Sequence, residues 1–213
     1  MKNLLKLMLL ITVVFAFSIA YSSDDSSSDD MSTTDDDGTV FPTEMHAAFE
    51  DFDPDYTDIY LDGANVVLET IGVPNHPTPY YSLTHPLYIA PTVTSEAQMT
   101  PTRIDTSGRD FEATLTVSSD PQMANSTSAT QLGSIGIAVS GAFIYNDQEG
   151  NGPLDSAAGS LDYAGAHIGP SNYHYHLEPL PFSDDDGNLI GIISDGFLFM
   201  EDLINLQTTI QQI

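Results

Sequence analysis

The chain has 213 residues, with 31 acidic side chains against four basic ones, a formal net charge of −27 and no cysteine. A negative field of this size repels phosphate groups, which excludes nucleic-acid binding and docking on anionic lipid. The lack of cysteine excludes disulfide bonds, thiolate metal ligands and cysteine nucleophiles. The length is enough for one folded domain.

Residues 1–20 are typical of a secretory signal peptide. Lys2 and Lys6 precede an apolar run, Leu7–Ala20, that is too short to span a bilayer comfortably. The small residues Ser18 and Ala20 stand where a signal peptidase cleaves. We therefore expect a secreted, periplasmic or cell-surface product, with the signal peptide removed and no membrane insertion afterwards.

Residues 21–39 consist mainly of Ser, Thr and Asp, a composition that predicts a disordered tether. The start of this tether resembles that of surface lipoproteins from Bacteroidetes, in which a cysteine would occupy position 21. Here the residue is Tyr21. Lipidation by this route is therefore chemically excluded.

Residues 40–213 are expected to form a single, mainly β domain. Short apolar runs alternate with Pro, Gly, Asn and Asp, as strands alternate with turns. The strand candidates are Asn65–Ile71, Phe111–Val117, Ile135–Tyr145, Leu189–Ile193 and Phe197–Phe199.

The segment between Val73 and Pro101 holds many of the 13 prolines and is expected to be a long ordered loop over the sheet. Met45–Phe49 is a candidate for one helical turn. The best candidate for a short C-terminal helix is Glu201–Ile213, because its leucines and isoleucine recur near helical spacing.

The segment Tyr173-His174-Tyr175-His176 is the strongest candidate for a chemical site. In a strand, alternation puts both imidazoles on one face and both phenols on the other. Two imidazoles on one face can bind one metal ion. The alternative is that the tyrosines face the core and the histidines are merely solvated or hydrogen-bonded.

His167 precedes this segment across the Gly169-Pro170 turn and is the expected third ligand. Imidazole ligands favour zinc or copper as the divalent metal. Asp162, Glu178 and Asp195 are carboxylates that could orient the imidazoles or bind the ion themselves. No pattern in the sequence identifies a protein partner.

Two acidic turns are candidates for calcium, which prefers oxygen ligands. They are Asn146–Asn151 and Asp184–Asn188. Neither fits an EF-hand loop, and the second is more simply an Asp-Gly turn between strands.

Several segments in the order of the chain resemble the YHYH-domain family, which takes its name from the tetrad at residues 173–176. The resembling segments are Gly72-Val73-Pro74-Asn75-His76, Ile137–Gly141, Asp162–His167, Ile190-Gly191 and Asp195-Gly196-Phe197. Ser140 replaces the more usual Asn, and Ala166 is inserted before His167. The resemblance implies an exported or surface protein, and it adds His76 and Asp195 to His167, His174 and His176 as site residues.

Family members usually continue further after the Asp-Gly-Phe segment, whereas this chain ends at Ile213. We therefore expect a shortened or diverged member. Three hypotheses for its function follow from the residues and the resemblance: a domain that binds a divalent metal, an extracellular metal-dependent hydrolase whose metal activates water, and a non-catalytic surface binding or adhesion module.

Overall fold

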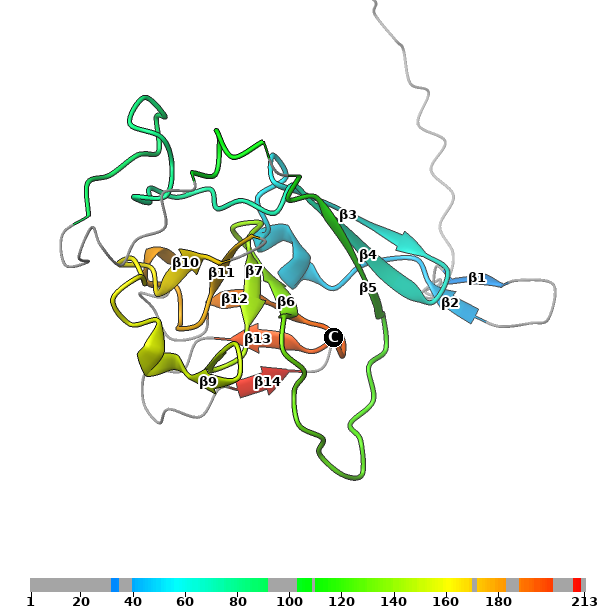
Figure 1. The fold of residues 1–213 in the computed structure, drawn as a ribbon. Helices are drawn as coiled ribbons and strands as arrows, with labels where there is room; N and C mark the ends of the chain where they lie inside the picture. The colour runs from blue at the N-terminus through cyan, green and yellow to red at the C-terminus, as the bar shows by residue number, and fades with distance from the viewer. Residues whose placement is uncertain are drawn as a thin grey trace, which may run out of the picture. The chain divides into compact units, whose positions relative to one another are not determined.

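The computed structural model of the chain describes residues 32–34, 40–91, 103–108, 110–169, 172–182, 188–200 and 209–211. These residues belong to one compact unit, Met31–Ile213. The expected signal peptide lies outside the described residues, and so does most of the expected tether. The mainly β fold is confirmed, since short strands dominate the described residues (Figure 1).

The larger sheet has seven strands in the spatial order β10-β11-β7-β6-β12-β13-β14. Their bounds are β6 Ser134–Ala138, β7 Phe143–Tyr145, β10 Ala166–Ile168, β11 Tyr173–Tyr175, β12 Leu189–Ile193, β13 Leu198–Met200 and β14 Thr209–Gln211. Neighbours are antiparallel except β11 and β7, which are parallel. The apolar run 135–145 thus holds two strands, joined by a turn at Gly141, whose φ of +91° favours glycine.

The smaller sheet has three antiparallel strands, β3 (Thr57–Asp62), β4 (Asn65–Thr70) and β5 (Ala113–Ser118). Two further strand pairs are short: β1 (Ser32–Thr34) with β2 (Val40–Pro42), and β8 (Gln148–Glu149) with β9 (Gly152–Pro153). The expected disorder of the tether does not extend to β1, because its backbone groups find partners in β2.

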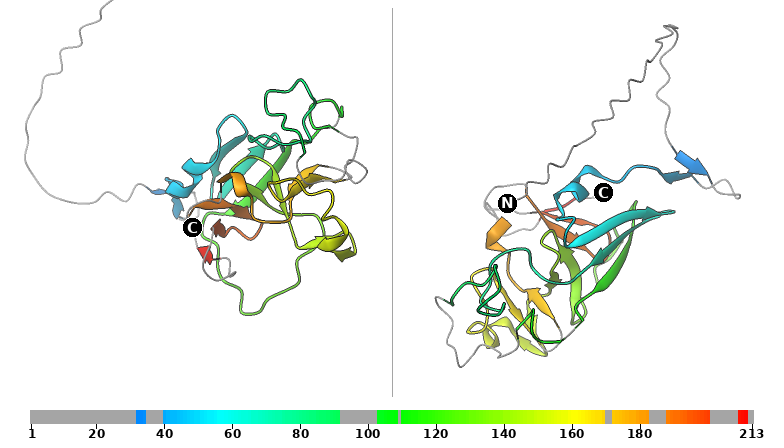
Figure 2. Two further views of the ribbon diagram at one scale, coloured as in Figure 1. Left: turned by 90° about the vertical axis from the view of Figure 1, so that its left-hand side faces the viewer. Right: turned by 90° about the horizontal axis from the view of Figure 1, so that it is seen from above.

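One hydrophobic core lies between the two sheets. Val66, Leu68 and Val117 of the smaller sheet pack with Ile137 and Ile192 of the larger one. Figures 1 and 2 show β3, β4 and β5 as a layer distinct from the larger sheet. Period-2 alternation in the strands places these residues on facing surfaces.

The described part of the proline-rich segment, residues 73–91, is an irregular loop, as expected. Its Tyr80 and Tyr81 pack with Tyr173 and Tyr175 of β11 in a second core on the other face of the larger sheet. A single parallel bridge between Thr78 and Tyr88 interrupts the irregular backbone. The loop therefore covers the face of β11 that carries the phenols.

The expected C-terminal helix is wrong for residues 209–211, which form β14 and pair with β13. Residues 201–208 of that prediction lie outside the described residues. Pairing with an available strand edge overrides the helical spacing there. The helices in the described residues are three 3₁₀ segments, η1 (Ala47–Asp51), η2 (Leu154–Ser156) and η3 (Leu180–Phe182), the first overlapping the expected turn at 45–49. None of these helices is long and apolar enough to cross a membrane.

Candidate metal centre

Strand β11 and His176, the residue directly after it, present the tetrad alternately to the two faces of the sheet. The phenol rings of Tyr173 and Tyr175 lie 5.7 Å apart between centroids and face the core under the loop. On the other face, the Nε2 atoms of His174 and His176 are 3.0 Å apart. The structure therefore has the two imidazoles on one face, as strand alternation predicts.

His167 joins them because β10 pairs with β11 in a register that sets His167 opposite His174. Paired residues of neighbouring strands share a face. The Nε2 atoms of His167 and His174 are 3.1 Å apart. Strand pairing thus brings together the three histidines that the sequence proposed as ligands.

Glu149, at the end of β8, is a fourth member that the sequence analysis did not single out. Its Oε2 lies 3.3 Å from Nε2 of His167 and 3.3 Å from Nε2 of His176. One ligand atom from each of the four residues lies within 4.8 Å of all the others. The only local signal was that Glu149 falls in the acidic turn 146–151, where oxygen ligands for calcium were considered.

The hydrogen bonds of His174 and His176 decide which ring nitrogen carries the proton. Nδ1 of His174 lies 3.1 Å from the carbonyl oxygen of Asn172, and Nδ1 of His176 lies 2.7 Å from that of Asn146. A carbonyl oxygen only accepts, so each Nδ1 carries the hydrogen and donates it. In the neutral rings, Nε2 then carries no hydrogen and has a free lone pair.

Ser160 fixes His167 in the same tautomer, with the hydrogen on Nδ1. Its hydroxyl donates to the carbonyl oxygen of Ala157 at 2.8 Å. The Oγ atom therefore accepts from Nδ1 of His167, which lies 2.8 Å away. Consequently all three Nε2 atoms offer lone pairs to one another and to the Glu149 carboxylate.

Lone pairs at these separations repel unless a cation lies between them, because none of the Nε2 atoms has a hydrogen to donate in the neutral state. A tetrahedral ion with ligands at about 2.0–2.1 Å separates its ligand atoms by about 3.3 Å. Four of the six separations between the ligand atoms are 3.0, 3.1, 3.3 and 3.3 Å. The donor set and its spacing both fit one small divalent ion.

Burial keeps His167 and His174 in the neutral form that binds metals. It lowers the pKa of His174 to about 3, with the neighbouring His167 and His176 acting in the same direction. Burial also lowers the pKa of His167, against an opposing effect of the Glu149 carboxylate. Both rings are thus available as ligands near neutral pH without first losing a proton.

Two neighbours restrict the ring of His174. Tyr145 stacks on it, with centroids 3.8 Å apart and planes 19° apart, and the Tyr145 hydroxyl donates to Oδ1 of Asn172. On another side, a Cβ added at Gly169 would lie 2.6 Å from Cε1 of His174. The ring orientation is therefore held by packing as well as by its hydrogen bond.

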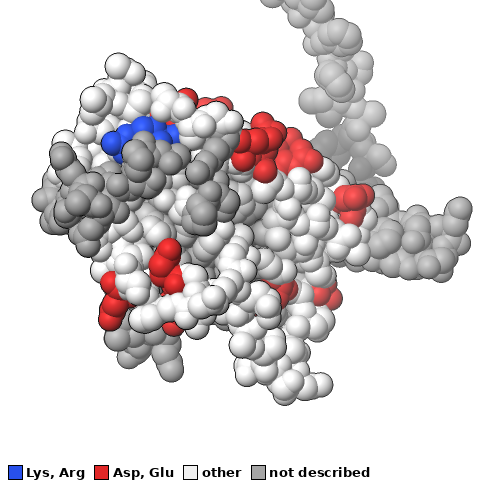
Figure 3. All heavy atoms as spheres, viewed as in Figure 1, with Lys and Arg blue, Asp and Glu red and all other residues white. Residues whose placement is uncertain are grey.

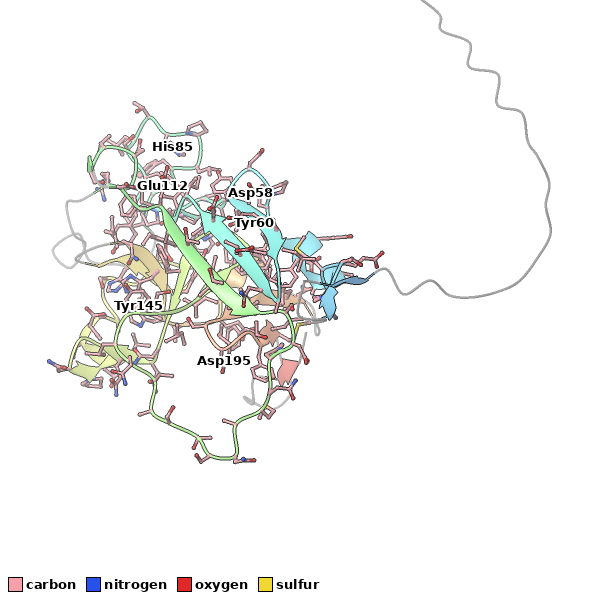
Figure 4. The ribbon with its side chains drawn as sticks, turned by 90° about the vertical axis from the view of Figure 1, so that its right-hand side faces the viewer. Asp58, Tyr60, His85, Glu112, Tyr145 and Asp195 are labelled. Atoms are coloured by element: carbon pink, nitrogen blue, oxygen red, sulfur yellow. The ribbon has the colours of Figure 1, made fainter. Side chains whose placement is uncertain are left out.

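His76 and Asp195, added by the family resemblance, are not in this cluster. His76 lies on the phenol side of β11, where its Nε2 accepts from the Tyr175 hydroxyl at 2.7 Å and its Nδ1 donates to Pro77. Asp195 is exposed in the turn between β12 and β13, and it lies well apart from Tyr145 in Figure 4. The structure does not bring either residue to the four-residue group.

Asp162 also has another role than orienting imidazoles. Its carboxylate accepts from the hydroxyls of Thr78 and Tyr173 and from the backbone N–H groups of Ala164 and Ala166. Burial raises the pKa of Asp162, and these hydrogen bonds oppose the rise. Asp162 therefore holds the loop and β11 together. Glu178 is exposed and outside the cluster, and most of the turn 184–188 lies outside the described residues.

A family model described as YHYH protein matches residues 114–211. The match includes β10, β11 and all four residues of the cluster, whereas the Gly72–His76 segment lies before it. Searches of curated proteins and of solved structures found no match. This match, which contains the tetrad at 173–176, shows that the chain contains a YHYH domain.

Proposed function

We propose that this domain binds one divalent transition-metal ion through Nε2 of His167, His174 and His176 and the carboxylate of Glu149. The observation that carries the proposal is the convergence of three Nε2 lone pairs, each left bare by the hydrogen bond of its Nδ1. Such partners of the distal nitrogen are typical of metal-bound histidines. His76 and Asp195 are not part of the proposed ligand set.

Zinc is the preferred ion, and copper is its main competitor. Three imidazoles and one carboxylate are a common type of donor set for zinc, and the ligand separations suit a tetrahedral ion. Copper binds such sites more tightly by the general order of divalent affinities. Calcium is disfavoured because it takes six to eight oxygen ligands and the cluster offers one carboxylate.

The test is metal content and affinity of the purified full chain. Wild-type protein is expected to bind one zinc per chain, measured by elemental analysis and by competition with a chelator. The double variant His174→Ala, His176→Ala is expected to bind no zinc at this site. His46→Ala is the matched control, because His46 is exposed and its Nδ1 accepts from the backbone of Ala48 outside the cluster. Equal zinc affinity in wild type and double variant would refute the proposal.

A metal-dependent hydrolase is the second candidate, favoured by the exposure of Glu149. Its side chain is 32% exposed, whereas those of His167 and His176 are 6% and 1% exposed. A catalytic zinc site keeps three protein ligands and one position for water, so Glu149 is the ligand that water would replace. The third candidate, a non-catalytic surface module, requires no metal.

Azide binding distinguishes an open site from a closed one. If the position of Glu149 is exchangeable, azide titrated into zinc-loaded wild-type protein binds, and it does not bind to metal-free protein. Binding to the zinc-loaded Glu149→Ala variant alone would indicate four fixed protein ligands and exclude the hydrolase. If neither the wild-type protein nor the Glu149→Ala variant binds azide, the hydrolase candidate is excluded as well.

Export is part of the proposal as well. The support is the signal-like sequence of residues 1–20 and the acidic composition. N-terminal sequencing of the protein recovered from expressing cells is expected to find Tyr21 as the first residue. Recovery of the chain from the cytoplasm with Met1 intact would contradict export.

A further inference from the structure

Strand β5 forms one edge of the three-stranded sheet, and β3 forms the other. Sheets usually protect their edges with charged side chains, proline or bulges, because an unpaired strand invites another strand to pair with it. β3 carries Asp58 and Asp62. β5 has the sequence ATLTVS, without charge or proline, and its pairing with β4 runs without a bulge. The edge at β5 therefore lacks the usual protection.

The pairing of β5 with β4 shows which backbone groups of β5 point outward. The N–H of Ser119 donates to the carbonyl oxygen of Ala64, so these two residues form a hydrogen-bonded pair. Hydrogen-bonded and non-hydrogen-bonded pairs alternate along antiparallel strands. Thr114 and Thr116 lie an odd number of residues before Ser119 and thus belong to non-hydrogen-bonded pairs. Their N–H and C=O groups consequently point away from β4.

These outward groups have no hydrogen-bond partner in the part of the chain that the structure describes. Thr114 and Thr116 are both exposed. The turn between β12 and β13 bounds the edge at its far end, because a Cβ added at Gly196 would lie 3.2 Å from the carbonyl oxygen of Ser118. The open part of the edge is therefore residues 113–117, where the two threonines offer their N–H and C=O groups to a further strand.

The inner face of this edge is apolar. Val117 is 3% exposed, and the half-buried Leu115 packs against the same core between the two sheets. Cross-strand neighbours on one face of a sheet contact each other. An apolar side chain of a further strand, placed opposite Leu115, would complete the burial of that leucine.

Carboxylates lie at both ends of the open edge. Glu112 directly precedes β5, as Figure 4 shows, and Asp120 follows shortly after the strand, with Asp195 in the adjoining turn. All three are exposed, and none of them forms an ion pair with another described residue. In Figure 3, acidic atoms lie near both ends of the strip where Figure 1 draws β5, and the basic atoms in view lie elsewhere. The ends of the edge thus attract cations and repel anions.

We propose that β5 binds an extended, basic peptide segment of another protein by antiparallel strand addition. The segment exchanges backbone hydrogen bonds with Thr114 and Thr116, as peptides do that extend a sheet at its edge. Its inward side chains are apolar and cover Leu115. Lysine or arginine at its two ends faces the carboxylates at the two ends of β5. This site is independent of the proposed metal centre.

A second copy of this chain fits the edge less well than a basic peptide does. Each copy has a net charge of −27, so two copies repel each other. In the symmetric register centred on Thr116, Glu112 of one copy would face Asp120 of the other, because both lie at the same sequence distance from Thr116. Like charges directly opposite each other destabilise strand pairing.

The first experiment titrates three peptides into the full chain by isothermal calorimetry. The probe is the capped peptide Lys-Lys-Val-Thr-Val-Thr-Val-Lys-Lys, which is expected to bind saturably, one per chain. The same peptide N-methylated at both threonines loses two backbone donors and is expected to bind at least about tenfold more weakly. A version with glutamate in place of every lysine is also expected to bind at least about tenfold more weakly. Equal binding of either comparison peptide would overturn the proposal.

The second experiment changes the edge itself. The N–H of Thr116 points outward, so Thr116→Pro removes an edge donor and keeps the hydrogen bonds between β5 and β4. This variant is expected to bind the lysine peptide at least about tenfold more weakly, with urea unfolding as the check of its fold. Thr116→Val is the matched control, because it keeps every backbone group, and it should bind as wild type does. Equal affinity of folded Thr116→Pro and wild type would contradict strand addition.

The third experiment removes charge from the two ends of the edge. Glu112→Gln with Asp120→Asn is expected to weaken binding of the lysine peptide at least about twofold and to reduce its salt dependence. This variant leaves the backbone groups of β5 in place, so it tests the proposal even if Thr116→Pro does not fold. Asp51→Asn is the control, since Asp51 is exposed at the end of η1. An unchanged affinity and salt dependence would overturn the choice of a basic partner.

Sedimentation of the wild-type chain without peptide tests the alternative occupant. A monomer is expected, and a dimer that Thr116→Pro dissociates would replace the peptide by a second copy. Zinc content, measured on the same samples, separates this site from the metal centre. The edge variants should bind zinc as wild type does, and the histidine double variant should bind the lysine peptide as wild type does. The two proposals can therefore fail separately.

Discussion

Nε2 of His174 and Nε2 of His176 lie 3.0 Å apart, and the Nδ1 atom of each ring donates to a backbone carbonyl oxygen. Two neutral imidazoles with this tautomer have no hydrogen between them. The backbone of Asn172 and Asn146 therefore prepares both rings as ligands before any ion binds. This preparation by the fold, more than the number of histidines, makes the cluster a candidate metal centre.

Ser160→Ala is expected to weaken zinc binding by about 10- to 100-fold, the usual effect of removing a hydrogen-bond partner from a metal-bound histidine. The variant removes the acceptor of the Nδ1–H of His167, which lies 2.8 Å from Oγ. Competition with a chelator measures the change. Ser82→Ala is the control, since Ser82 bonds to Asp105 in an exposed loop. Unchanged zinc affinity in Ser160→Ala would show that His167 is oriented by other means.

Gly169→Ala is expected to lower zinc affinity by displacing the ring of His174. A Cβ at this position would lie 2.6 Å from Cε1 of that ring, well inside van der Waals contact. Either the imidazole or the backbone must shift, and the ligand separations change in both cases. Chelator competition measures the change in zinc affinity, with Gly63→Ala as a comparison where an added Cβ meets nothing within 4 Å. Gly63 has a φ of +59° and lies in the turn between β3 and β4, so that variant is strained locally and changes no residue of the cluster. Equal affinities would contradict the prediction.

The metal-free protein is expected to lose stability as the pH falls from 7 toward 5. Burial lowers the folded-state pKa of His174 to about 3, whereas the unfolded chain has an ordinary imidazole pKa near 6.5. The unfolded state therefore binds more protons in the window between these values, and the free energy of unfolding falls with falling pH. The slope approaches about 1.4 kcal/mol per pH unit for one such group.

Urea unfolding at several pH values, with chelator present, measures this slope. The slope is expected to be smaller in His174→Gln, because that variant removes the group whose pKa is shifted. Zinc-loaded wild-type protein should stay folded to lower pH than the metal-free form, because an ion that binds only the folded state adds its binding free energy to the stability. A slope that is the same in wild type and variant would assign the pH dependence to other groups.

Tyr175→Phe is expected to lower the free energy of unfolding by about 1–3 kcal/mol, since it leaves buried partners without a hydrogen bond. The Tyr175 hydroxyl accepts from Oγ of Ser140 at 2.7 Å and donates to Nε2 of His76 at 2.7 Å. Urea unfolding measures the loss. Tyr60→Phe is the matched control, because Tyr60 is 40% exposed and its hydroxyl donates to the exposed Glu69. Equal losses in the two variants would show that this buried chain of hydrogen bonds adds nothing to stability.

The amino-acid sequence by itself determined the mainly β character of the chain and the arrangement within β11. Both are local properties: β-branched and aromatic runs between Gly and Pro favour strands, and alternation places His174 and His176 on one face. The sequence also predicted His167 as a site residue, because the Gly169-Pro170 pair predicts a turn that brings the chain back beside the tetrad. The prediction of a C-terminal helix was wrong at residues 209–211, because these residues pair with the edge of β13.

Only the tertiary structure decided which other residues complete the site. Glu149 comes from a separate short strand, and its local sequence marked it only as one residue of the acidic turn 146–151. His76 and His174 are alike as residues, but the loop carries His76 to the phenol side of β11. The tautomers depend on carbonyl groups of Asn146 and Asn172, whose positions follow from backbone conformation. Long-range pairing and packing thus bring together three of the six histidines as proposed ligands, because these interactions join residues that are distant along the chain.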